Sequence, residues 1–542
     1  MRNGLASRKA EDSASRLFES TLHFSGEIAS NLNISALGGY SCQDFTNEGF
    51  SAEGGDFLTD DFSFNNLSAA LDFKNGKGTI TSFKSSNRLS AFFGRINLII
   101  KNIWFVTASA RYEGSSRFGA NNKWGLFPAA GAGMDVAKVL NIKFINNLKL
   151  RLNYGITGNQ PGESYLSLLR LSSLSPQWYS WYDGNFYPEY SVVNNANPDL
   201  KWEKKGEFDA GFDFSIFKNK LSGSFDFYTS KTKDLLQQYF VPVPPNLYNL
   251  EWMNNGEIRS SGLELTLNYK VIDKTDFSYR ITLTHSRNFR NTLVLPLYLY
   301  YGTSLVTYNT EVIGDIGSPG HGGEPLILLE EGKPIGQLIG YVFNGIDQNG
   351  RIILADINHD GSINGLDRTI IGHGLPKSMM GFDNVFNYKN WDLNIFFRGV
   401  FGHDLLNSYR SFYEVPNYIE YYNLPETATN MRNNTTGELA TITSGILTSK
   451  DVENASFISL DNITLGYSFR LPVSSQFSSI RIFLGGNNLF YLTGYKGPDP
   501  NPRYVDSEPD LGTYNSPLVP GVDRRNTWPR TRSVTFGVNV VL

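Results

Sequence analysis

The sequence predicts an all-β protein whose strands form an antiparallel transmembrane β-barrel, and three observations lead to this prediction. Apolar and polar residues alternate with a period of two in segments throughout the chain, which is typical of strands with one apolar and one polar face. Short polar turns alternate strictly with long connections along the sequence. Aromatic residues make up 14% of the 542 residues, a supply that aromatic girdles at two membrane interfaces would use.

The alternation is clearest in residues 205–231. Phe208, Phe212 and Phe214 alternate with Asp209 and Asp213, and a second alternating run follows a short polar turn. The turn predicts an antiparallel hairpin. Its polar face carries carboxylates and hydroxyls, as expected if the apolar face meets lipid and the polar face lines a lumen.

The same pattern predicts fifteen strands. Their spans are 19–27, 32–40, 88–99, 103–113, 127–136, 146–157, 205–216, 219–230, 257–270, 275–288, 378–388, 391–400, 456–471, 479–490 and 531–542. We therefore expect a polar N-terminal segment over 1–18 and barrel over 19–542. The largest predicted connections lie near 41–87, 158–204, 289–377, 401–455 and 491–530.

The parity of the connections indicates orientation. Bacterial outer-membrane barrels have short periplasmic turns, long extracellular loops and an even number of strands. A soluble sandwich has no reason to keep such parity. An odd count of fifteen indicates either a missed strand or barrel strands outside this sequence. The N-terminus lacks the apolar core of a signal peptide, which favours the second interpretation.

Composition excludes several classes of protein. A net charge of -4 gives no case for nucleic-acid binding, and a single cysteine, Cys42, excludes a disulfide framework. No nucleotide-binding, zinc-protease or serine-hydrolase motif occurs, so we predict no enzyme and no catalytic residue. Tyrosine-rich stretches at 177–189, 296–303 and 409–422 are candidate sugar- or peptide-binding surfaces. Alternatively, their rings pack on one another.

One stretch has the spacing of a calcium loop. It places oxygen-bearing residues at loop positions 1, 3, 5, 7 and 12, with glycine at position 6 for the turn. The predicted ligands are Asp356, Asn358, Asp360, Ser362 through its backbone carbonyl, and Asp367. Ca²⁺ would make a long loop rigid and would not take part in catalysis. The alternative is an Asx-rich turn without metal.

Several stretches together resemble the SusC/RagA-type TonB-dependent outer-membrane transporters of Bacteroidetes. They lie, in the order of the family's barrel, at 88–138, 197–236, 256–269, 356–382, 455–472, 485–501 and 528–542. The resemblance covers most of the chain. The last residue, Leu542, departs from the phenylalanine with which the family commonly ends.

The resemblance implies a 22-stranded barrel in the outer membrane, of which this chain would supply about fifteen strands and no plug domain. It also implies a SusD-like lipoprotein over the extracellular loops, and import of glycans or peptides with energy from the TonB system through the plug. On this interpretation the chain is the C-terminal barrel part of such a transporter, as a truncated or split gene product. The alternative is a soluble, Ca²⁺-stabilised β-rich module that binds polysaccharide and buries its apolar faces between two sheets.

Overall fold

A computed structural model describes most of the chain. It describes residues 4–59, 61, 63–142, 144–173, 179–294, 297–301, 304–308, 310–316, 318, 325–348, 351–433, 435–439, 447–471, 477–502, 520–525 and 528–541.

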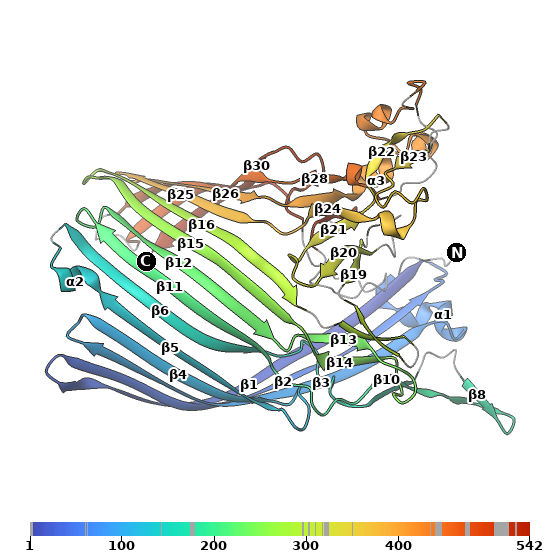
Figure 1. Ribbon diagram of the computed structural model, residues 1–542, viewed down its shortest axis with the longest axis horizontal. Helices are drawn as coiled ribbons and strands as arrows, with labels where there is room; N and C mark the ends of the chain where they lie inside the picture. The colour runs from blue at the N-terminus through green and yellow to red at the C-terminus, as the bar shows by residue number, and fades with distance from the viewer. Residues whose placement is uncertain are drawn as a thin grey trace.

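One antiparallel sheet of fifteen strands dominates the described structure (Figure 1). In sheet order the strands are β1 (Leu5–Ala29), β2 (Leu32–Gly55), β3 (Thr79–Ile100), β4 (Trp104–Ser115), β5 (Trp124–Asp135), β6 (Ile145–Asn159), β11 (Glu203–Ile216), β12 (Leu221–Lys233), β15 (Glu257–Asp273), β16 (Phe277–Val294), β25 (Ser378–Tyr388), β26 (Trp391–Phe401), β29 (Phe457–Arg470), β30 (Ser479–Thr493) and β32 (Ser533–Val541). Each predicted span overlaps one of these strands. The sheet is curled like the wall of a barrel, with short turns at one end and long connections at the other (Figure 1).

The N-terminal segment differs from the prediction. Strand β1 begins at Leu5, so most of the polar segment over 1–18, which lies outside the predicted strands, is strand, and β2 and β3 extend with it beyond the predicted ends. Leu5–Phe18 pairs with Cys42–Gly55 in unbroken register. This three-stranded extension is held by backbone pairing and polar cross-strand contacts, including Ser51 to Thr81 at 2.7 Å. In β1, polar side chains occupy both faces over residues 8–13, so no period-two signal marks this part of the strand. The connection expected at 41–87 shortens accordingly.

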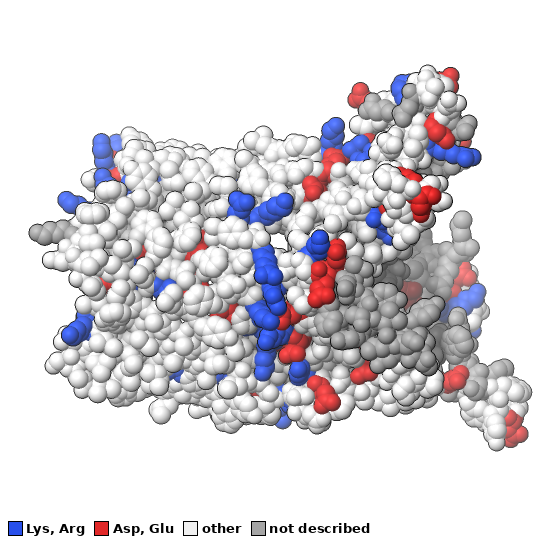
Figure 2. Space-filling view, in the orientation of Figure 1, with Lys and Arg blue, Asp and Glu red and all other residues white. Residues whose placement is uncertain are grey.

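The two faces of the sheet differ in chemistry. One face, the apolar face, carries exposed hydrophobic side chains such as Leu152 (55% exposed), Phe208 (41%) and Val534 (73%). On the opposite, polar face Asn153 donates a hydrogen bond to Asp209, and Asp213 pairs with Arg151. A soluble module would bury the hydrophobic side chains against a second sheet, so this alternative is not supported. Figure 2 shows a surface almost free of charge between Lys and Arg at the turn end and a column of Lys and Arg toward the loop end.

The long connections carry small sheets of their own. These are β7 (Arg170–Ser173) with β10 (Tyr190–Asn194), β8 (Tyr179–Tyr182) with β9 (Asn185–Pro188), β13 (Leu236–Phe240) with β14 (Leu250–Asn254), β17 (Leu297–Tyr301) with β18 (Ser304–Tyr308), β22 (Phe343–Ile346) with β23 (Ile352–Leu354), the sheet of β19 (Thr310–Asp315), β20 (Pro325–Glu330), β21 (Gln337–Gly340) and β24 (Thr369–His373), and the sheet of β27 (Asp404–Asn407), β28 (Val452–Asn454) and β31 (Val522–Asp523).

The helices are short. They are α1 (Leu71–Lys74), α2 (Val136–Leu140) and α3 (Ser408–Tyr413), with 3-10 turns at Ser63–Asn65, Leu67–Ala69, Gly365–Asp367, Pro416–Glu420, Glu426–Asn430 and Ser449–Asp451. In the described part of the chain, none of the helices combines the length and the apolar character needed to cross a membrane.

Four of the long connections share one hydrophobic core at the loop end. Leu235 comes from the connection between β12 and β15, Ile316, Leu326 and Leu338 from the connection between β16 and β25, Leu406 from the next connection, and Val522 from the last. Their side chains are 5% exposed or less. We call this set the loop core. It makes the four connections one packed unit, so they are not independent loops.

Candidate functional site

The polar face of the sheet is lined by close ion pairs. Arg151 of β6 donates to Asp213 of β11 at 2.9 Å and to Asp226 of β12 at 2.8 Å. Gly211 lies directly opposite Arg151 in the register. A Cβ at Gly211 would lie 2.1 Å from the Asp226 carboxylate, so the absence of a side chain there leaves room for the bridge. Asn153 continues the network with a 2.9 Å bond to Asp209.

A second group of ion pairs lies on the strands nearer the C-terminus. Arg398 donates to both carboxylate oxygens of Asp461, at 2.5 and 3.3 Å. Arg481 pairs with Asp392 in the same bidentate manner, at 2.9 and 2.5 Å. Such forked pairs are rigid as well as strong. The polar face is therefore a fixed hydrophilic wall, suited to lining a water-filled lumen.

A cavity of about 760 Å³ opens on the polar face of the β1–β3 extension, beside the connections that follow β4 and β6. Among the described residues, three of the polar side chains that line it each have a buried polar atom without a hydrogen-bond partner: Asn87 Oδ1, Arg117 Nε and Arg170 Nε. Phe83 and Tyr165 line the same cavity. Two guanidinium donors, an amide acceptor and aromatic rings can bind a ligand with carbonyls or hydroxyls. We call this space the mouth cavity.

Asparagine side chains fasten the connection that follows β6 to the connection that follows β12. Asn195 donates to the carbonyls of Tyr248 (2.7 Å) and Leu250 (3.0 Å) and accepts from the Tyr248 amide (3.0 Å). In the opposite direction, Asn254 donates to the Lys201 carbonyl at 2.7 Å and accepts from the Lys201 amide at 2.8 Å. Our sequence reasoning missed these residues. The run of asparagines at 194–197 was the available signal.

The predicted calcium-loop residues do gather in one turn. Asp356 accepts from the Gly361 amide and Asp360 from the Ser362 amide, both at 2.8 Å. Asp367 is fully buried and accepts from the amides of Asn364 (2.8 Å) and Ile357 (2.9 Å). Backbone hydrogen bonds, above all that from Asn364, hold the pKa of Asp367 below its usual value.

This turn also resembles the metal-free alternative. Asn358 and Asp360 bond to each other at 2.9 Å. Within the described ranges, no group of three or more His, Cys, Asp or Glu side chains is arranged to hold a metal ion. One atom still lacks a partner within the part of the chain that the structure describes: Asp356 Oδ1 is buried and accepts no hydrogen bond there. Calcium binding by Asp356, Asn358, Asp360, Ser362 and Asp367 stays a prediction, for which the free oxygen is the supporting observation.

The tyrosine-rich stretches have different outcomes. In 409–422 the rings of Phe412, Tyr413 and Tyr422 pack on one another with centroids 5.0–5.8 Å apart, as the packing alternative predicts. In 177–189, Trp181 and Tyr182 are more than half exposed, so they remain candidate contacts for a ligand. The side chains of 296–303 lie outside the described residues.

Comparisons with known proteins agree with this architecture. The family model described as "TonB dependent receptor-like, beta-barrel" matches residues 12–489. TonB-dependent receptor P3 of Formosa agariphila is 29% identical over 579 residues, which covers 99% of this chain and 53% of that protein. TonB-dependent receptor SusC of Bacteroides thetaiotaomicron is 30% identical over 456 residues, covering 79% and 43%.

Among solved structures, the RagAB peptide transporter matches with a TM-score of 0.81 at 22% identity, covering 98% of this chain and 56% of that one. At this identity the match supports the fold alone. The chain spans about half the length of the curated relatives it matches.

Proposed function

The chain belongs to the TonB-dependent receptor-like β-barrel family, and from this premise we propose that it forms the C-terminal part of the barrel of a SusC-like outer-membrane transporter. The family consists of receptors and transporters and not of enzymes. The observation that carries the proposal is the single fifteen-stranded sheet with an exposed apolar face and an ion-paired polar face. Such a wall separates lipid from a lumen.

The proposal includes the rest of the transport machinery. A complete barrel of 22 strands would pair further strands with the edges of β1 and β32, which do not pair with each other in the described structure. A plug in the lumen would transmit energy from the TonB system. A SusD-like lipoprotein would cover the loop end, where the loop core holds the long connections together as one unit.

The substrate would be a glycan or a peptide that enters at the loop end. The mouth cavity supports this, because Arg117, Arg170 and Asn87 offer hydrogen-bonding atoms that no described residue pairs with, at the edge of the polar face. Both substrate classes present carbonyls or hydroxyls to such groups. The aromatic rings of Phe83 and Tyr165 would contact the apolar side of the same substrate.

The test is uptake by the native host. Deletion of the gene should abolish growth on a particular defined oligosaccharide or oligopeptide at low concentration, and complementation should restore it. Replacing Arg117 and Arg170 together with glutamine should raise the concentration needed for growth. The matched control, Lys218→Gln in a turn at the opposite end of β11, should not. Absence of the protein from the outer-membrane fraction, or unchanged growth on every oligosaccharide and oligopeptide after deletion, would contradict the proposal.

We also propose that the turn at 356–367 binds Ca²⁺ and makes the connection between β16 and β25 rigid. The loop spacing and the unpartnered oxygen of Asp356 support it. Calcium titration of the purified protein by calorimetry should show one site that Asp360→Asn weakens and that Asp183→Asn, an exposed control, leaves unchanged. Equal heats for the wild type and for Asp360→Asn would contradict the proposal.

A further inference from the structure

The apolar face of β1–β4 has a hollow within its hydrophobic part. A cavity of about 540 Å³ is lined almost entirely by apolar surface. Cross-strand pairing places Leu22 opposite Gly38, Gly38 opposite Gly94, and Gly94 opposite Ala110. Because glycine and alanine replace large side chains at three neighbouring positions, the wall is recessed there. Leu22, 81% exposed, stands at the edge of the recess. We call it the apolar hollow.

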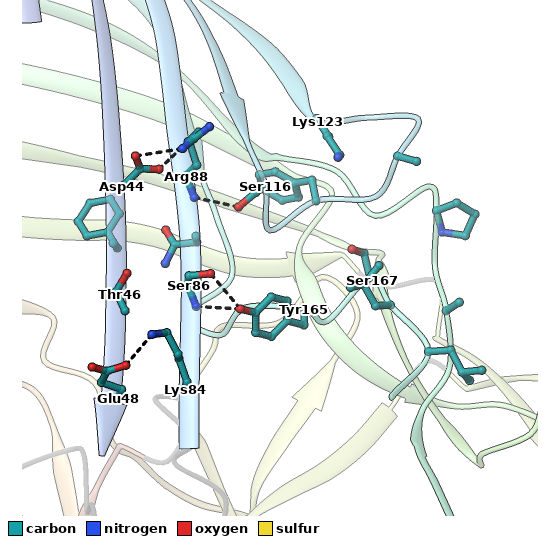
Figure 3. A pocket seen from close by; sticks show the side chains of 18 of the residues that line it. Asp44, Thr46, Glu48, Lys84, Ser86, Arg88, Ser116, Lys123, Tyr165 and Ser167 are labelled. Atoms are coloured by element: carbon teal, nitrogen blue, oxygen red, sulfur yellow. Dashed lines mark hydrogen bonds and ion pairs between the residues drawn. The ribbon is translucent and has the colours of Figure 1, made fainter. Parts of the chain in front are cut away.

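A second, larger cavity lies further along the same strands, toward the loop end. It measures about 1100 Å³ and is bounded by β2, β3 and the connections that follow β4 and β6. Figure 3 shows the Arg88–Asp44 and Lys84–Glu48 pairs along the strands, Lys123 across the cavity, and Tyr165 bonded to Ser86. We call it the basic pocket.

The register places both spaces on one face. Residues that lie opposite each other on neighbouring strands share a face of the sheet. Asp209 on β11 is connected to Ser35 on β2 by a continuous row of such opposite residues across the intervening strands, so the odd-numbered residues of β2 lie on the polar face. Gly38 and Asp44 are therefore both on the apolar face. Arg16, Asp44 and Arg88 lie opposite one another on β1, β2 and β3.

Aromatic rings separate the apolar hollow from the basic pocket. Tyr40, Phe92 and Tyr112 lie opposite one another on β2, β3 and β4. Tyr40 packs on Phe92 at 5.0 Å, and Tyr112 stacks on Trp124 at 4.9 Å. Along β2, Gly38, Tyr40 and Asp44 thus mark apolar, aromatic and charged levels within about 20 Å of strand. This is the order of acyl chain, interface and headgroup in a lipid leaflet.

The basic pocket has an excess of positive charge. Four cationic side chains line it against two carboxylates: Arg16, Lys84, Arg88 and Lys123 against Asp44 and Glu48. Both carboxylates are paired, with Arg88 at 2.5 Å and with Lys84 at 2.7 Å. In the part of the chain that the structure describes, the Arg16 and Lys123 side chains make no ion pair. Two cations are thus available to an anionic ligand.

We propose that the basic pocket and the apolar hollow together bind one phosphorylated glycolipid of the outer leaflet, of the lipid A type. A phosphate is held by Arg16, Lys123 and the free donors of Arg88, since guanidinium groups match phosphate oxygens in a forked geometry. An acyl chain fills the recess over Gly38 and Gly94. Free phosphate would not explain the aligned apolar hollow. The proposal rests on the proposed outer-membrane location.

The experiment uses the full protein, expressed from its own gene and extracted from the outer membrane in mild detergent. Native mass spectrometry measures the lipid A retained, and then the affinity for added purified lipid A. The test variant replaces Arg16, Arg88 and Lys123 with glutamine. The control replaces Lys204 and Lys233, which lie opposite each other on the apolar face of β11 and β12 at the loop end, away from both spaces. All five side chains are exposed, so folding should persist.

A second variant tests the apolar hollow. Gly38→Leu should fill it without strain, because a Cβ at Gly38 meets no atom within 4 Å. We expect the triple variant to lose about tenfold or more in lipid A affinity, the equivalent of one strong charged contact, and Gly38→Leu also to lower it. The control should match the wild type, and millimolar inorganic phosphate should not displace the lipid.

Several results would overturn the inference. Unchanged lipid A binding in the triple variant would show that these three cations do not hold the phosphate. An equal loss of affinity in the Lys204 and Lys233 control would show that the lipid is attracted unspecifically by positive charge. Complete displacement of lipid A by inorganic phosphate would show that the basic pocket binds only an anion. Unchanged lipid A affinity in Gly38→Leu would show that no acyl chain occupies the apolar hollow. A protein absent from the outer membrane would refute the proposed function instead, which fractionation reports separately.

Discussion

Replacing Asn195 with alanine should loosen the attachment between the connections that follow β6 and β12. The side chain is 6% exposed and makes three hydrogen bonds to the backbone of Tyr248 and Leu250, between 2.7 and 3.0 Å long. Each such bond contributes about 1 kcal/mol net, so the loss is roughly 3 kcal/mol, or about a hundredfold in the local opening equilibrium. Asn195→Asp should be worse, because a buried carboxylate would face two carbonyl oxygens.

Hydrogen exchange measured by mass spectrometry reports this local opening directly. The amide of Tyr248, which donates to Asn195, should exchange about a hundredfold faster in Asn195→Ala, while amides of β6 and β11 keep their protection. The control is Asn185→Ala, an exposed asparagine with one 3.2 Å bond inside its own hairpin. Equal exchange at Tyr248 in wild type and Asn195→Ala would refute the assignment of these bonds as the fastening between the connections.

Three other predictions concern separate parts of the molecule. Burial raises the pKa of Asp523 to about 7 from a usual 3.8, so the protonated form is favoured in the fold. The stability of the loop core should be greatest below about pH 4 and fall as the pH rises to about 7. Hydrogen exchange measured across this pH range should show the fall in stability, and Asp523→Asn should make the stability less dependent on pH. An equal pH dependence in the variant would contradict the assignment to Asp523. Gly211→Ala should destabilise the barrel by about 1–3 kcal/mol through overpacking against the neighbouring carboxylate. Gly38→Ala, the control, should leave the urea unfolding midpoint unchanged. Equal urea midpoints for the two variants would contradict the packing argument. Arg117→Gln and Arg170→Gln should each weaken substrate binding by about tenfold with unchanged melting temperature, and full affinity in both would exclude the mouth cavity as a substrate contact.

The strands of the sheet were predictable because each position meets one of two opposite environments. Phe208 and Asp209 differ in chemistry for that reason, and the alternation is visible in the sequence without any tertiary knowledge. The first part of β1 was not predictable by this route. From Arg8 to Ser13, β1 carries polar side chains on both faces, so strand pairing continues where the alternation stops.

The functional surfaces were less predictable, because they depend on contacts between distant segments. Asn195 reaches Tyr248, 53 positions away, and no local pattern specifies that partner. The mouth cavity likewise joins Asn87, Arg117 and Arg170 from three different segments. The turn at 356–367 is the opposite case. Its spacing is entirely local, and the sequence located it correctly as a turn.

The loop core sets the order in which the molecule can assemble. Arg524 donates to the carbonyl of Ile316 across 208 positions, and Val522 packs in a core with Leu326 and Leu338. Contacts of such long range form late, since the closure entropy of the whole intervening chain must be overcome first. The last contributions to the loop core, those of Val522 and Arg524, can therefore form only after almost the whole chain has been made.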